Sequence, residues 1–148
     1  MKKIIILLLA IMMCVACVGC DLSLGSIKEK ITYEPVTLAA INEEFEQNAM
    51  RAEENYVGKY VRFTCYIEDI STYEITFYEK SGIAPSLGTL YDYKCYAEVN
   101  KKDSSLMDKV KNLNKGGQVV VGGKITYLSD SSFTPCRVYM DLYEVVVQ

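Results

Sequence analysis

Tyrosine is the side chain on which binding chemistry could rest in this sequence. The chain of 148 residues has 12 tyrosines and neither histidine nor tryptophan. A tyrosine ring offers a flat surface for stacking and a hydroxyl for hydrogen bonds, which suits sugar rings, nucleobases or peptide prolines. Six residues lie on the polar side of expected strands or at the rim beside them, and they predict a ligand-binding face: Tyr66, Thr76, Tyr78, Lys94, Tyr96 and Tyr127. Ordinary pairing of tyrosines between neighbouring strands explains the same pattern without a ligand, so both interpretations stay open.

Three cysteines fall on the apolar sides of expected strands, at Cys65, Cys95 and Cys136. The strands that carry Cys95 and Cys136 are neighbours in the fold predicted below, so we expect these two to form a disulfide. Closing a loop of this length would stabilise the fold by roughly 3–4 kcal/mol in the chain-entropy model. The alternative is three buried thiols that act as small apolar side chains. Their long spacings, without histidine, predict no metal site, and no cofactor is expected.

Catalytic side chains are the group that the composition restricts most. Without histidine, the chain has no Ser-His or Cys-His pair and no imidazole ligand for a catalytic zinc ion. Glu68, Asp69 and Glu74 are close in the sequence, but they flank an expected turn, where acidic residues are common. Nothing places two carboxylates across a defined cleft, as glycoside hydrolysis would require. We therefore expect no catalytic residues and no enzymatic activity.

The N-terminus has the pattern of an export segment. Two lysines precede an apolar run over residues 4–18, and Cys17-Val18-Gly19-Cys20 then resembles a bacterial lipobox. The resemblance implies cleavage after Gly19 and a lipid on the Cys20 thiol, with residues 1–19 as the signal peptide. The protein would then be held in the lipid bilayer of a bacterial cell membrane, facing outside the cytoplasm. A lipobox ending at Cys17, a simple secretory signal and an uncleaved membrane helix are the alternatives, and the apolar run is short for the last.

Residues 20–36 read as a polar tether, and residues 37–148 as the folded domain. From Leu38 to Tyr56, apolar residues recur every three or four positions, which predicts one amphipathic helix capped by Thr37 and ended by Gly58. The rest of this helix is rich in glutamate. A solvated helix face explains that acidity better than a cation site does.

Alternation of apolar and polar residues predicts five strands, over residues 57–70, 74–79, 90–99, 118–128 and 136–147. A short helix after Asp103 or Ser104 separates the third strand from the fourth. Gly122-Gly123 predicts a bulge or sharp bend in the fourth strand. Three strands, a helix and two strands is the order of an OB-fold, so we predict a mainly β protein, a five-stranded Greek-key barrel with an N-terminal helix. A split α+β sheet is the alternative.

Several short motifs resemble one family. They are Asn48-x3-Ala52-x3-Tyr56-x-Gly58-Lys59, then Val61-x-Phe63, and later Lys115-Gly116 and Tyr127-Leu128-Ser129-Asp130. This set is similar to the tRNA-anti-like OB-fold family of bacterial lipoproteins, over roughly residues 38–146. The resemblance implies an OB barrel with an N-terminal helix in an exported lipoprotein, and it implies no assigned activity.

The charge balance bears on the partner. The chain has a net charge of −3, and loss of the signal peptide would remove Lys2 and Lys3 but no acidic residue. A mildly acidic domain argues against nucleic acid, because lysine and arginine supply most nonspecific affinity for phosphates. The sequence therefore predicts a membrane-anchored, non-catalytic binding module, for a glycan or a peptide. The alternatives are a structural partner of another envelope protein, with the acidic helix face as the contact, and a single-stranded nucleic-acid binder.

Overall fold

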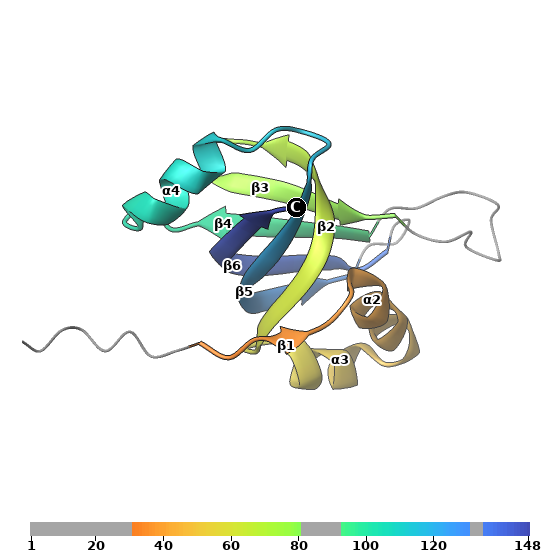
Figure 1. Cartoon of the computed structure of the whole chain (residues 1–148). Coiled ribbons are helices and arrows are strands. Elements are labelled where there is room, and N and C mark those ends of the chain that lie inside the picture. The colour runs from red at the N-terminus through yellow and green to blue at the C-terminus, as the bar shows by residue number, and fades with distance from the viewer. Residues whose placement is uncertain (1–30, 81–92, 131–134) are drawn as a thin grey trace, which may run out of the picture. The chain divides into compact units, whose positions relative to one another are not determined.

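The computed structural model describes residues 31–80, 93–130 and 135–148 (Figure 1). The expected signal peptide, the cysteine expected to carry a lipid (Cys20) and most of the expected tether lie outside these residues. Among the residues described, no helix is long and apolar enough to cross a bilayer.

A closed barrel of five strands forms the body of the protein. Its strands are β2 (Tyr60–Ile70), β3 (Glu74–Glu79), β4 (Tyr93–Val99), β5 (Gln118–Ser129) and β6 (Arg137–Val147). They pair in the order β2-β3-β4-β6-β5, and β5 pairs back onto β2 and so closes the barrel. Only β4 and β6 run parallel among these pairs. This is the connectivity of an OB-fold, and closure through β2 and β5 rules out the split α+β sheet.

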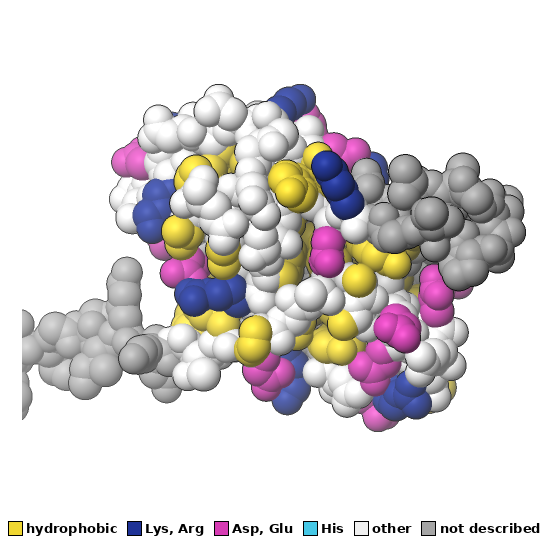
Figure 2. Space-filling view, turned by 45° about the vertical axis from the view of Figure 1, so that its right-hand side comes forward, with side chains coloured by type: hydrophobic (Ala, Val, Ile, Leu, Met, Phe, Trp, Pro, Cys, Tyr) yellow, Lys and Arg dark blue, Asp and Glu magenta, His cyan; other side chains and the backbone are white. Residues whose placement is uncertain are grey.

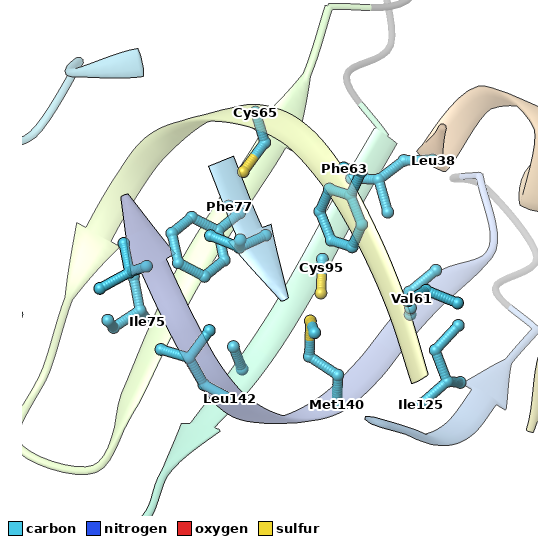
Figure 3. Packing of buried hydrophobic residues seen from close by; sticks show 14 of the residues in the cluster. Leu38, Val61, Phe63, Cys65, Ile75, Phe77, Cys95, Ile125, Met140 and Leu142 are labelled. Atoms are coloured by element: carbon cyan, nitrogen blue, oxygen red, sulfur yellow. The ribbon is translucent and has the colours of Figure 1, made fainter. Parts of the chain in front are cut away.

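The strand alternation fills the barrel interior as the sequence predicts. On β2 the inward residues Val61, Phe63, Cys65 and Ile67 are at most 3% exposed. Figure 3 shows the side chains of Val61, Phe63 and Cys65 directed into the same core as residues of the other strands, among them Phe77, Cys95, Met140 and Leu142. The buried residues of the described barrel strands are thus apolar side chains, thiols and glycines, so a binding role falls to the outer faces of these strands.

A bulge occurs opposite the glycine pair, but its extra residue is on β6 and not, as the sequence predicted, on the strand β5 that contains the glycines. In the β5–β6 ladder, Gly122 lies opposite Glu144 and Gly123 opposite Leu142, so one residue of β6 is skipped. Such a bulge bends the strand. The skipped residue is Tyr143, so the strand that bends here is β6, and within β5 the register shifts between Ile125 and Tyr127.

A short strand, β1 (Glu34–Pro35), precedes the barrel and was not expected. It pairs in parallel with Val61 and Arg62 of β2, and the Val36 amide donates to the Arg62 carbonyl oxygen. Tyr33 packs edge-on against Tyr60, with ring centroids 6.4 Å apart. The folded unit accordingly begins at Ile31, and residues 31–36 belong to it and not to the tether in which the sequence placed them.

Two helices stand where the sequence predicts one. They are α2 (Leu38–Gln47), capped by Thr37, and α3 (Ala49–Tyr56), whose first turn is capped by the side chain of Asn48. Asn48 has an extended backbone, with φ −163° and ψ 98°. Because the axis changes there, Leu38, Ile41 and Ala52 are buried but Ala49, which belongs to the predicted stripe, is exposed.

The third described helix, α4 (Ser104–Lys111), connects β4 to β5. Asp103 accepts a hydrogen bond from the Leu106 amide at 3.0 Å and so caps its first turn. Leu106, Val110 and Leu113 are buried. Figure 1 shows α4 at one end of the barrel and α2 and α3 toward the other.

Candidate binding face

The tyrosines of the expected ligand face lie on the outside of the barrel, where their rings form one stacked pair and one group of three. Tyr66 on β2 lies opposite Tyr78 on β3, and their rings stack with centroids 5.5 Å apart. Tyr96 on β4 stacks on Tyr139 of β6 at 5.2 Å, with an interplanar angle of 20°. Tyr127 on β5 is next, 5.8 Å from Tyr139. We call these five residues the tyrosine array.

The strand register brings the predicted residues together. Thr76 is the partner of Tyr96, and Lys94 is the partner of Tyr78, in the β3–β4 ladder. All six predicted residues therefore lie on the exterior of the barrel, spread over β2, β3, β4 and β5. Four tyrosines of the array are half-buried against their neighbours, whereas Tyr127 is 56% exposed. Packing between neighbouring rings restricts their movement.

Tyr139 is the residue of the array that the sequence analysis missed. It contacts both Tyr96 and Tyr127, so it joins these two rings in one group of three. Its outward direction follows from the alternation of β6, where Val138 and Met140 are buried. The sequence therefore indicated that Tyr139 points outward. That it lies beside Tyr96 follows only from the parallel register of β4 and β6.

Charged residues of opposite sign border the array. On one side, the Lys80 ammonium lies 5.2 Å from the Tyr66 ring centroid, and Lys94, which pairs with Glu68 at 2.6 Å, is the register partner of Arg137. On the other side, one register row holds Glu74, Glu98 and Asp141. Figure 2 likewise shows basic and acidic side chains interspersed on the face in view. A polyanion would meet repulsion along one border of the array.

The three cysteines do not form the expected disulfide. Cys65, Cys95 and Cys136 are all free and buried. In the parallel ladder Cys95 faces Val138, whereas Cys136 comes before the first residue of β6 and so is not opposite Cys95. Burial raises the pKa of Cys136 to about 11, and burial raises the pKa values of Cys65 and Cys95 further. Protonated, enclosed thiols are poor nucleophiles and poor metal ligands.

The carboxylates near the first turn have structural partners. Glu68 pairs with Lys94, and Asp69 pairs with Lys115, whose ammonium lowers the pKa of the Asp69 carboxyl through a hydrogen bond and its charge. Within residues 31–80, 93–130 and 135–148, no three acidic or thiol side chains converge as a metal site would require.

A cavity of about 520 Å³ lies beside the acidic border of the array. Its principal lining residues are Tyr73, Glu98, Lys101, Asp141, Leu142 and Tyr143. Sequence reasoning did not find it, because its walls come from the β2–β3 turn, the end of β4 and the middle of β6. Those segments meet only when β6 pairs with β4.

Comparisons with known proteins add the following. No family model and no curated protein matches the chain. A structure described as a "putative nucleic acid-binding lipoprotein" from Klebsiella pneumoniae is similar with 17% identity and a TM-score of 0.47, over 76% of this chain and 92% of that one. A "putative aspartyl-tRNA synthetase" from Leishmania major is similar with 10% identity and a TM-score of 0.46, over 83% of this chain but 22% of that one.

A small single-stranded DNA-binding protein from Streptomyces coelicolor is also similar, with 9% identity and a TM-score of 0.43, over 60% of this chain and 93% of that one. Identities and scores this low do not carry a ligand or an activity over to this chain, because one fold serves many unrelated functions. The assignment to the OB-fold rests on the strand connectivity of the chain itself.

Proposed function

We propose that this protein is a non-catalytic binding module whose ligand face is the tyrosine array, tethered to the outside of a bacterial cell membrane by a lipid on Cys20. The lipobox-like sequence supports the tether, and the motif likeness to the tRNA-anti-like lipoproteins agrees with it. The ligand class is a glycan or a peptide of the cell envelope.

The observation that carries the proposal is the number of strands that contribute to the array. Stacked pairs on adjacent strands are common, but here every strand of the barrel contributes an outward tyrosine, in one stacked pair and one group of three. Tyr78 and Tyr96 lie on β3 and β4, the second and third strands of the barrel, whose outer face is the one on which OB-folds bind ligands. Ring edges and hydroxyls suit the alternating apolar and polar surfaces of sugars and extended peptides.

The decisive experiment measures binding of soluble peptidoglycan fragments to the purified protein. Replacement of Tyr96 or Tyr139 by alanine should weaken binding at least about fivefold, since stacking on an aromatic side chain contributes on the order of 1 kcal/mol. Tyr60→Ala is the matched control, because Tyr60 stacks in a different cluster with Tyr33 and Tyr143. Equal binding by all three variants would show that the array only pairs strands.

A second candidate function is docking onto another envelope protein through the acidic helix face. Glu43, Glu46, Glu53 and Glu54 are all exposed on α2 and α3. Crosslinking in intact cells should then recover a basic partner, and substitution of these glutamates by glutamine should abolish the crosslink while array variants leave it intact. Binding of an oligodeoxythymidine in low salt, lost as salt rises, would instead favour the nucleic-acid alternative.

The lipid anchor has its own test. Cells that express the protein with Cys20→Ser should incorporate no radiolabelled fatty acid into it and should release it from the membrane fraction. Label that persists in this variant would move the acylated residue elsewhere, with Cys17 the next candidate.

A further inference from the structure

We propose that the cavity beside β4 and β6 binds a single organic cation, the ammonium or guanidinium group at the end of a basic peptide side chain. This site is separate from the tyrosine array and does not depend on the array's ligand. Three features of the cavity lead to it: its carboxylates, its aromatic rings and the lysine already seated in it.

The carboxylates are Glu98 and Asp141, which are direct partners in the parallel β4–β6 ladder. Neighbouring strands are about 4.8 Å apart, and like charges directly opposite each other on a sheet are destabilising. Glu74 extends the row from β3 as the partner of Glu98. Among the described ion pairs, none involves Glu98 or Asp141. A cation placed between them would relieve this repulsion.

The aromatic walls are Tyr73 and Tyr143, which are 57% and 42% exposed. A ring face attracts a cation within about 6 Å of its centroid. Rings together with carboxylates favour an organic cation over a metal ion, because an alkylammonium or guanidinium has apolar atoms that pack on the rings and N–H groups that reach the oxygens.

Lys101 shows that an ammonium fits this place. Its Nζ lies 3.4 Å from the centroid of the Tyr73 ring. Lys124 is the register partner of Asp141, but its Nζ is directed at Tyr60, 5.9 Å from that ring centroid. Among the lining residues, two carboxylates and one lysine leave one net negative charge. The cavity is therefore complementary to one further positive charge, and Lys101 competes for the Tyr73 ring.

The volume agrees with a side chain as the ligand. Ligand pockets range from roughly 300 to 1,000 Å³, so a cavity of about 520 Å³ holds one lysine or arginine side chain with its flanking backbone. The cavity adjoins the acidic border of the array, so a peptide that lies along the array could place a basic residue here.

The test titrates the full chain, purified in a non-ionic detergent, with Nα-acetyl-lysine methylamide while amide resonances are followed by NMR. Saturable shifts are expected at Glu98, Lys101 and Asp141, and the same probe acetylated on Nε should bind at least about fivefold more weakly because it has lost its charge. The double variant E98Q/D141N should lose affinity to the same extent. The double variant should keep its fold, because the substitutions remove two like charges that face each other. Amide resonances away from the two positions should match those of the native protein, which checks this.

Two matched variants sharpen the test. Glu74→Gln removes a carboxylate from the same row that does not line the cavity, and it should leave affinity within about twofold. Lys101→Gln removes the internal competitor and should tighten binding. Tyr127→Ala, at the far end of the array, should leave lysine binding unchanged even where it weakens binding of peptidoglycan fragments. Shifts that do not saturate, equal shifts with the acetylated probe, or equal losses in E74Q and E98Q/D141N would overturn the proposal.

Discussion

At the scale of single residues, Gly122 and Gly123 are neighbours in sequence but meet different surroundings. A Cβ atom on Gly123 would lie 2.1 Å from Met140 Cε and 2.3 Å from the Asp141 carbonyl oxygen. A Cβ atom on Gly122 would meet only side-chain atoms closely, the Tyr33 ring at 3.0 Å and Glu144 Oε2 at 3.2 Å. Side chains can move aside, whereas the backbone of a paired strand cannot do so without loss of the ladder.

We therefore predict different outcomes for the two alanine variants. Gly123→Ala should lower the free energy of unfolding by about 3 kcal/mol, at the upper end of overpacking effects, because β6 must move away from β5. Gly122→Ala should lower it by about 1 kcal/mol or less. Urea denaturation of both variants measures the difference. Equal losses would mean that the β5–β6 bulge does not require glycine at position 123.

The buried thiols make stability depend on alkaline pH. Burial raises the pKa of Cys136 from 9.0 to about 11, so the folded protein keeps this proton after the unfolded chain has lost it. The unfolded state then binds fewer protons, and stability falls as the pH rises from about 9 to 11. We predict a shallower fall for Cys136→Ala than for the native sequence in urea denaturation at several pH values. Parallel curves would show that Cys136 does not contribute to it.

At the scale of elements, one long-range contact fastens α2 to the barrel. The Leu38 amide at the start of the helix donates to Glu79 Oε2 at 2.7 Å, at the end of β3. A carboxylate in this position satisfies a free amide and interacts favourably with the helix dipole. Leu38 is fully buried beside it, so the contact sets the point at which the helix meets the strand.

Glu79→Ala should therefore destabilise the protein by about 1–2 kcal/mol, the range for a partly buried charge at a helix terminus. Glu79→Gln retains an acceptor and should recover part of this loss. Glu74→Ala, at the other end of the same strand, should change stability by about 0.5 kcal/mol at most. The urea midpoints of the three variants measure these differences. A loss of stability in E74A equal to that in E79A would argue against a stabilising role for the Leu38–Glu79 hydrogen bond.

The strands could be predicted from the sequence and the helix break could not. Period-two alternation is a direct consequence of strand geometry, so the inward residues of β2 were predicted correctly. Asn48 was hidden by its position within an otherwise regular apolar stripe. An asparagine can cap a new helix or sit on the surface of a continuous one, and only packing of α3 apart from α2 selects the cap.

The candidate binding face could be predicted in part from the sequence, for a related reason. Alternation assigned Tyr66, Tyr78 and Tyr96 to the outer side of their strands, and that needs no tertiary information. Contacts between strands distant in the chain depend on register, which the sequence does not state. The stacking of Tyr96 on Tyr139, the cavity and the free state of Cys95 and Cys136 all follow from the parallel register of β4 with β6.

At the scale of the whole molecule, residues 31–36 complete the barrel surface. The Tyr33 ring covers Gly122, and the Arg62 guanidinium lies 5.0 Å from the centroid of that ring. Arg62 also pairs with Glu144 of β6. The segment thus joins β2, β5 and β6 on the outside, and its sequence looked like a linker because its only strand is two residues long.

A chain shortened to residues 37–148 should therefore be less stable than one of residues 31–148, by roughly 1–3 kcal/mol. Tyr33→Ala in the longer chain should account for a large share of this loss, because it removes the ring that covers Gly122. Thermal unfolding of the three proteins measures the contributions. Equal midpoints for the two lengths would return residues 31–36 to the tether.

The two-residue ladder between β1 and β2 also has a mechanical consequence. Any force applied to the chain before Ile31 enters the barrel through β1, and this ladder with the Tyr33 packing is the first link that it loads. Detachment of residues 31–36 from β2 would lengthen the tether by about 20 Å, at 3.3–3.6 Å per extended residue. The β2–β5 pairing that closes the barrel does not involve this segment, so the barrel would stay folded while residues 31–36 extend under load.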